Sequence, residues 1–76
     1  MPATGASDVF RENLAIILKE QGVSMSELAR RIGTAQANIS RIIHGKEQVT
    51  IDRAQRIAEA LDVSLREILT EREISA

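Results

Sequence analysis

Gly33 and the residues around it constrain the fold of this chain more than any other feature of its sequence. The segments 24–32, SMSELARRI, and 35–43, AQANISRII, each have the length of a short helix and lie on either side of Gly33. Glycine closes a helix in the left-handed conformation without a Cβ clash, so we expect the first helix to end there. Ala29 supplies the small side chain that two helices crossing steeply over a tight turn require. The segment therefore predicts two short helices joined by a tight turn.

Apolar residues on both helices are spaced to meet in one core. Leu28 and Ile32 are spaced i, i+4 on the first helix, and Ile39 and Ile42 are spaced i, i+3 on the second. Such spacings place two side chains on the same side of a helix. Two amphipathic helices joined in this way form a helix-turn-helix, a motif found in DNA-binding proteins. The segment thus indicates a DNA-binding protein.

Length and composition fit one small all-α domain. Its 76 residues suffice for a single core, which must consist of Leu, Ile, Val, Ala and Met because the chain has one Phe, no Tyr and no Trp. The absence of cysteine excludes disulfides and thiolate metal sites. No apolar run approaches the length of a membrane span, and the N-terminus lacks a signal-peptide pattern. We therefore expect a soluble, cytoplasmic protein without a membrane segment.

Helical periodicity extends over most of the chain and predicts a compact fold of five short helices. Besides the two central helices, we expect one from about Ser7 to Gln21, one from Ile51 to near Asp62 and one beginning at Leu65. The expected boundaries are a disordered N-terminal tail of residues 1–6, a domain of residues 7–70 and a C-terminal tail of residues 71–76.

Side chains that accept hydrogen bonds from free backbone N–H groups predict where helices begin. Ser24 and Ser64 each stand three residues before a glutamate, which is the capping-box pattern S-x-x-E. Thr34 and Thr50 are expected to cap the third and fourth helices in the same way. Each such N-cap contributes about 1 kcal/mol of stability.

Charge is distributed unevenly along the chain, although the net charge is only −1. Residues 30–56 contain six basic and two acidic residues, a balance of +4. Residues 1–29 contain two basic and four acidic residues, and residues 57–76 contain two and five. The arginines alone fit solvated helix faces equally well, but their position beside the helix-turn-helix favours contacts with phosphates.

The segments ELARRIGTAQANISRIIHGK and IAEALDVSLREIL resemble the lambda-repressor-like (Cro/CI-type, XRE-family) helix-turn-helix regulators. The resemblance covers roughly Val9 to Leu69 and rests on L-A-x-x-x-G, on I-S-R-I, on Gly45 and on the I-A-x-A-L-x-V-S-L-x-x-I-L pattern. It implies a five-helix fold that binds double-stranded DNA in the major groove through the third helix. It also implies transcriptional regulation, with repression as the expected sense, and a dimer on a two-fold symmetric operator.

Residues at the start of the third helix are expected to contact bases, because a recognition helix meets base edges with its N-terminal turn. Gln36 is the first candidate, since its amide pairs with both N6 and N7 of adenine. Arg41 fits either a guanine or a phosphate, and Asn38 either a base or a phosphate. Ala35 and Ala37 either pack on a thymine methyl group or merely fill space.

Donors near helix ends are expected to contact phosphates, because helix N-termini favour anions. The candidates are Ser24, Ser26, Ser40, His44, Lys46 and Thr50. Ser24 and Thr50 have the alternative role of helix caps. The resemblance further implies that a glutamine often stands at the position of Met25 and braces the glutamine of the third helix, so this contact is expected to be absent here.

Neither catalysis nor binding of a metal or cofactor is expected. His44 is the only histidine, no cysteine accompanies it, and a protein-only zinc site would need three carboxylates. There is no glycine-rich phosphate loop and no histidine at motif spacing from a serine.

The alternative function is that of a protein-interaction module, such as an antitoxin or a coactivator. The absence of acidic residues between Gly33 and Lys46 favours DNA, and the chain has no long extra segment to wrap a toxin. A third alternative is that the chain is the DNA-binding head of a longer regulator.

A homodimer is expected because one helix contacts only a few base pairs, whereas a two-fold pair doubles the discrimination. The expected interface consists of Leu65, Ile68, Leu69 and Ile74, which are more apolar positions than one small core needs.

Overall fold

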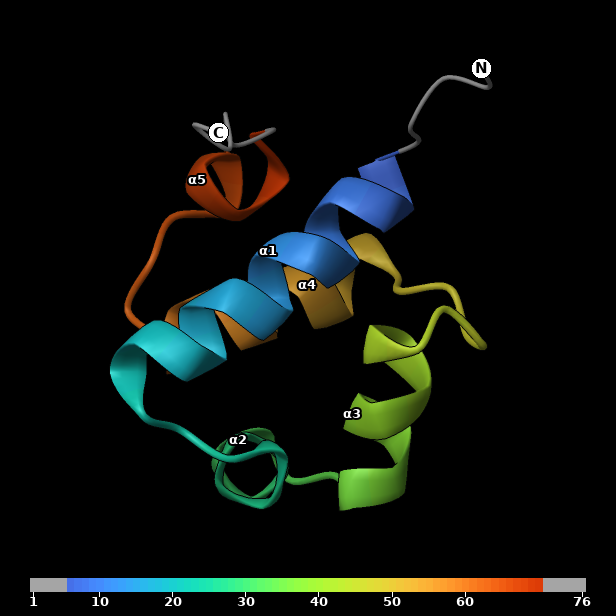
Figure 1. The fold of residues 1–76 in the computed structure, drawn as a ribbon, viewed down its shortest axis with the longest axis vertical. Coiled ribbons are helices and arrows are strands. Elements are labelled where there is room, and N and C mark those ends of the chain that lie inside the picture. The colour runs from blue at the N-terminus through green and yellow to red at the C-terminus, as the bar shows by residue number, and fades with distance from the viewer. Residues whose placement is uncertain (1–5, 71–76) are drawn as a thin grey trace.

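The computed structural model describes the backbone of residues 6–70 and the side chains of residues 8–70. This part of the chain forms five helices, which confirms the predicted all-α fold (Figure 1). They are α1 (Ala6–Gln21), α2 (Met25–Ile32), α3 (Gln36–Ile43), α4 (Ile51–Ala60) and α5 (Leu65–Leu69). α1 begins one residue before the expected start of the domain at residue 7. The rest of the two expected tails, including Ile74, lies outside the described residues.

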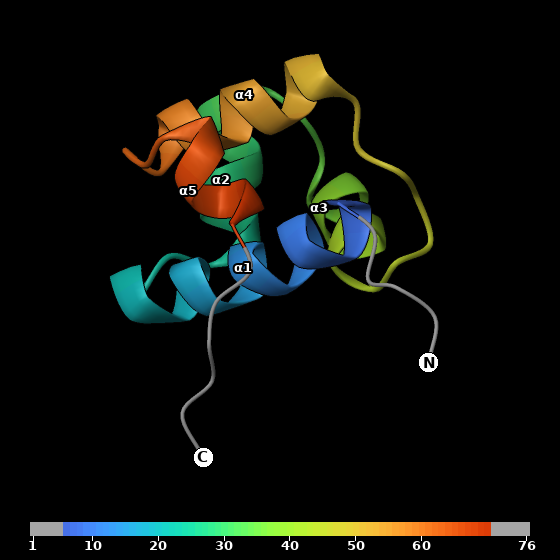
Figure 2. The ribbon, with the colours of Figure 1, turned by 90° about the horizontal axis from the view of Figure 1, so that it is seen from above.

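The helices enclose a single core. α1 and α4 lie on opposite sides of the domain, the α2–α3 pair lies at one end and α5 at the other (Figures 1 and 2). α1 contributes Phe10, Leu14, Ile17 and Leu18, which recur at helical spacing and are all buried. Buried side chains from the other four helices and from Leu61, the C-cap of α4, complete the core: Leu28, Ala29, Ile39, Ile42, Ala54, Ile57, Ala58, Leu61 and Ile68. The α2–α3 pair is therefore held rigidly against the rest of the domain.

The turn between α2 and α3 has the predicted geometry. Gly33 is the C-cap of α2 in the left-handed conformation, with φ 74°, and Thr34 N donates to the carbonyl oxygen of Ala29 at 2.8 Å. A Cβ atom at Gly33 would meet nothing within 4 Å. Glycine is thus needed here for its backbone conformation and not for space. Ala29 is only 2% exposed at the crossing of the two helices.

Three of the four predicted caps are confirmed. Ser24, Thr50 and Ser64 each accept a hydrogen bond from the backbone N–H three residues later, at the starts of α2, α4 and α5. The prediction for Thr34 is wrong, because the N-cap of α3 is Ala35, which makes no side-chain hydrogen bond. The hydroxyl of Thr34 instead accepts from Asn38 Nδ2 at 2.6 Å, inside α3.

No helix in the described part of the chain is both long and apolar enough to cross a membrane.

Candidate nucleic-acid interface

The amino end of α3 is exposed. Because Ile39 and Ile42 point into the core, the opposite side of α3 faces outward. Three of the predicted base-contacting residues, Ala35, Gln36 and Ala37, are exposed at this end. Arg41 is exposed one turn later, and Asn38 is half-buried between them. The structure therefore brings all five residues to the accessible side of α3 or to its edge.

Gln36 is held by a contact that the sequence analysis did not predict. Ser26 Oγ in the first turn of α2 donates a hydrogen bond to Gln36 Oε1 at 2.8 Å. Met25 is half-buried and packs against the core, so the neighbouring serine braces the glutamine instead of residue 25. The bond leaves both N–H donors of the Gln36 amide and one lone pair of its oxygen for other partners.

Asn38 and Arg41 interact with each other. Arg41 Nη2 donates to Asn38 Oδ1, and Arg41 Nε lies 3.9 Å from Glu47 Oε1 in the loop after α3. Asn38 Nδ2 donates to the hydroxyl of Thr34. The two side chains are thus ordered by the protein itself.

The candidates for phosphate contacts differ in how far their polar groups are already used within the protein. The hydroxyl oxygens of Ser24 and Thr50 are used as helix caps, although both residues are exposed. Lys46 is exposed, and its ammonium group makes no hydrogen bond or ion pair with another described residue, although its backbone N–H donates to the carbonyl oxygen of Arg41 at 2.8 Å. Ser40 is half-buried, and its Oγ lies 3.3 Å from His44 Nδ1.

His44 is exposed, and one of its ring nitrogens is in contact with Ser40. Its Nδ1 lies 2.8 Å from the carbonyl oxygen of Ser40. A carbonyl oxygen only accepts hydrogen bonds, so the proton of the neutral ring is on Nδ1.

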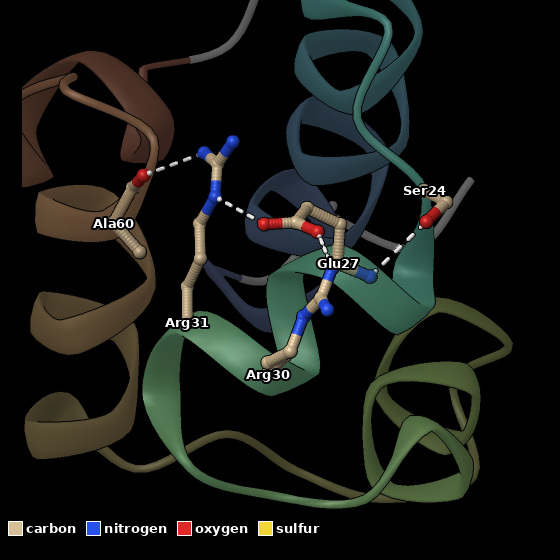
Figure 3. A network of polar contacts seen from close by, with 5 residues as sticks. All are labelled: Ser24, Glu27, Arg30, Arg31 and Ala60. Carbon is tan, nitrogen blue, oxygen red and sulfur yellow. Dashed lines mark hydrogen bonds and ion pairs between the residues drawn. The ribbon is translucent and has the colours of Figure 1, made fainter.

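Part of the positive charge around the helix-turn-helix is paired within the protein. The carboxylate of Glu27 accepts hydrogen bonds from Arg30 and from Arg31, the latter at 3.2 Å (Figure 3). Arg31 also donates to the carbonyl oxygen of Ala60 at 3.1 Å and so ties α2 to the carboxyl end of α4. Counting charges along the sequence does not reveal this pairing, although its spacings of three and four residues are those of neighbours on a helix. It leaves Lys46 as an unpaired cation in the loop after α3.

Glu27 is expected to make stability depend on pH. The hydrogen bond from Arg30, and then that from Arg31, lower the pKa of Glu27 below its ordinary value of 4.5. A carboxyl group whose pKa is depressed by folding stabilises the native state above the unfolded-state pKa, and this contribution is lost as pH falls through the folded-state pKa. Glu27→Gln should therefore lower the free energy of unfolding at pH 7, and the difference from the wild type should shrink below about pH 4.5. Urea unfolding from pH 7 to 3 measures it. Glu12→Gln removes an exposed charge as a control, and a difference that stays constant down to pH 3 would contradict the assignment.

The predicted dimer interface needs one correction. Ile68 is 0% exposed and belongs to the core of the domain, so its side chain is not available to a second chain. Leu65 and Leu69 are half-buried and pack at the edge of the same core. Ile74 lies outside the described residues.

Asn13 fixes α5 and was missed by the sequence analysis. It is 2% exposed, and its Nδ2 donates to the carbonyl oxygens of Ile68 at 2.7 Å and of Thr70 at 2.8 Å. Its position three residues after Phe10 and four before Ile17, on the apolar side of α1, was the available indication. Gln21 Nε2 makes a similar bond to the carbonyl oxygen of Leu61, at 2.7 Å.

Within the described residues, no three histidine, aspartate or glutamate side chains gather closely enough to hold a metal ion.

Comparison with known proteins gives a consistent assignment. The clp gene regulator ClgR from C. glutamicum is 19% identical, with a TM-score of 0.82 over 88% of this chain and 87% of that chain. A hypothetical transcription factor, NHTF from Neisseria, is 22% identical, with a TM-score of 0.82 over 93% and 87%. The restriction-modification controller protein C.AhdI from Aeromonas hydrophila is 25% identical, with a TM-score of 0.75 over 79% and 91%. No curated protein matches significantly in sequence. A helix-turn-helix family model matches residues 14–68, and the chain therefore belongs to the XRE-type helix-turn-helix family of DNA-binding transcription regulators.

Proposed function

We propose that this chain binds a specific double-stranded DNA operator with the amino end of α3 in the major groove and represses transcription by occupying that site. The observation that carries the proposal is the exposed amide of Gln36, held by Ser26 at the start of a helix whose other side is buried. An amide fixed in this way offers a donor and an acceptor side by side, which matches N7 and N6 of adenine. A major groove is wide enough to admit the whole helix.

Phosphate contacts on both sides of α3 would fix its orientation in the groove. The exposed N-terminus of α2 at Ser24 and Ser26 presents backbone N–H groups and a positive helix end. Lys46 supplies an unpaired cation on the other side of α3, and His44 adjoins it. Such contacts provide affinity without sequence preference.

A second copy of the chain is the proposed protein partner. One α3 contacts only a few base pairs, and a two-fold pair contacts two half-sites about one turn, ~34 Å, apart. The half-buried Leu65 and Leu69 on α5 are the proposed interface residues among those described.

Selection from a random duplex library, followed by salt titration of the enriched duplex, tests the function. We expect a two-fold symmetric site bound by two chains, with an affinity that falls as salt rises. Lys46→Ala should reduce the slope of affinity against salt concentration by the amount expected for about one lost phosphate contact per chain. It should weaken binding to all duplexes to a similar extent. Arg66→Ala removes the same charge from α5, at the other end of the domain, and should leave the slope nearly unchanged. Failure to enrich any duplex at modest salt would refute the proposal.

A further inference from the structure

Polar side chains alongside α3 form a continuous chain of contacts that the proposed function does not use. Arg53 Nη1 in the first turn of α4 donates to Thr34 Oγ1 at 3.3 Å, and Asn38 Nδ2 donates to the same oxygen at 2.6 Å. Asn38 Oδ1 accepts from Arg41 Nη2, and Arg41 Nε lies 3.9 Å from Glu47 Oε1. The chain of contacts thus links α4, the turn before α3, α3 itself and the loop after it.

The amide of Asn38 makes one hydrogen bond at each end. Guanidinium groups only donate hydrogen bonds, so the atom of Asn38 that faces Arg41 must be the oxygen. The nitrogen then faces Thr34, whose hydroxyl accepts. If the amide were flipped, its N–H donors would face the N–H donors of Arg41, and no hydrogen bond could form. The contact with Arg41 therefore fixes the orientation of the amide. Asn38 is also half-buried, whereas Arg41 is exposed.

The position of Asn38 determines the direction in which Arg41 extends. Asn38 lies three residues before Arg41 on the same helix, so the hydrogen bond draws the guanidinium towards the amino end of α3. That is the end at which Gln36 is exposed. The carboxylate of Glu47, 3.9 Å from Arg41 Nε, disfavours the approach of a phosphate to the same guanidinium group.

We propose that Asn38 is a positioning residue that presents Arg41 to a guanine in the operator and contacts no base itself. The inference rests on the proposed function, because it assigns roles within the same interface. A guanidinium binds O6 and N7 of guanine with two parallel N–H groups, and this geometry is lost if the long side chain is free to rotate. Holding it beforehand removes part of the ordering cost of binding, which corresponds to roughly 2- to 10-fold in affinity.

A double-mutant cycle tests the proposal. The dissociation constants of the wild type, Asn38→Ala, Arg41→Ala and the double variant are measured on the selected duplex and on a scrambled duplex of equal composition. The preference is the ratio of the two dissociation constants. Partial unfolding weakens binding to both duplexes alike, so a purely structural defect leaves this ratio unchanged. We expect Arg41→Ala to reduce the preference by roughly 5- to 150-fold. Asn38→Ala should reduce it by roughly 2- to 10-fold in the wild type and should have no further effect in the Arg41→Ala background.

Thr34 provides an independent test of the same chain of contacts. Thr34→Val removes the acceptor for Asn38 with little change of shape and should reproduce part of the effect of Asn38→Ala. Thr34→Ser keeps the hydroxyl and should retain the wild-type preference.

The outcomes are distinct. Equal losses from Asn38→Ala with and without Arg41 would mean that Asn38 contacts DNA directly, and no change of preference would mean that it has only a structural role. Either result overturns the inference while leaving the proposed function intact. A wild-type chain that prefers no duplex would instead refute the proposed function.

Discussion

Replacing Asn13 with alanine is expected to lower the free energy of unfolding by about 1–3 kcal/mol, because it leaves one buried and one part-buried carbonyl group without this donor. The carbonyl oxygens of Ile68 and Thr70 both receive their hydrogen bond from this one amide. The first of these bonds is buried, so water cannot easily replace it. In a domain of this size the loss corresponds to a decrease in melting temperature of roughly 4–8 °C per kcal/mol.

Two further variants separate the hydrogen bonds from packing. Asn13→Leu fills the same space without a donor and should be destabilised as well, whereas a stability equal to the wild type would show that packing alone matters. Gln21→Ala removes an amide that donates a single, part-buried hydrogen bond and should cost less. Amide hydrogen exchange in α5 should accelerate in Asn13→Ala relative to α2 and α3, because the lost contacts hold that short helix onto α1.

The features that the sequence predicted correctly depend on residues close together in the chain. Gly33 ends α2 because of its own backbone conformation, and Ser24, Thr50 and Ser64 accept bonds from residues three positions later. Helical spacing of Leu, Ile and Phe similarly identified the core-facing side of each helix. Such rules need no knowledge of how the helices pack.

The features that were missed depend on contacts between distant segments. Thr34 was expected to cap α3, but the N-cap of that helix is the next residue, Ala35. The hydroxyl of Thr34 instead accepts a hydrogen bond from Arg53 on α4. Ile68 was assigned to a dimer interface. The sequence could not show that the other helices bury it, because that burial depends on the whole fold. Asn13 was overlooked because its two partners are more than fifty residues away.

The candidate interface shows the same division. Gln36 could be predicted from its place at the start of a helix, whereas its contact with Ser26 requires the crossing of α2 and α3 to be known. Pairing of Arg30 and Arg31 with Glu27, by contrast, spans only three and four residues of α2, and it reduces the positive charge of this segment that is available to DNA. The two arginines form ion pairs within α2. The positive charge that remains available to DNA includes the unpaired ammonium group of Lys46.

Gln36→Ala is expected to reduce the preference for the selected duplex over a scrambled one by roughly 5- to 150-fold, which corresponds to about 1–3 kcal/mol for one bidentate base contact. Binding to the scrambled duplex should hardly change, because phosphate contacts do not depend on this amide. Fluorescence anisotropy titrations on both duplexes at one fixed salt concentration measure the two constants.

Variants of Ser26 and Gln55 serve as controls for the Gln36→Ala measurement. Ser26→Ala frees the amide of Gln36 without removing it, so it should lower the preference by less than Gln36→Ala does. Gln55→Ala makes the same chemical change at an exposed glutamine of α4 and should leave the preference unaltered. If Gln36→Ala weakens both duplexes equally, the amide contacts a phosphate or supports the fold. The base contacts would then have to come from Arg41 and the neighbouring alanines alone.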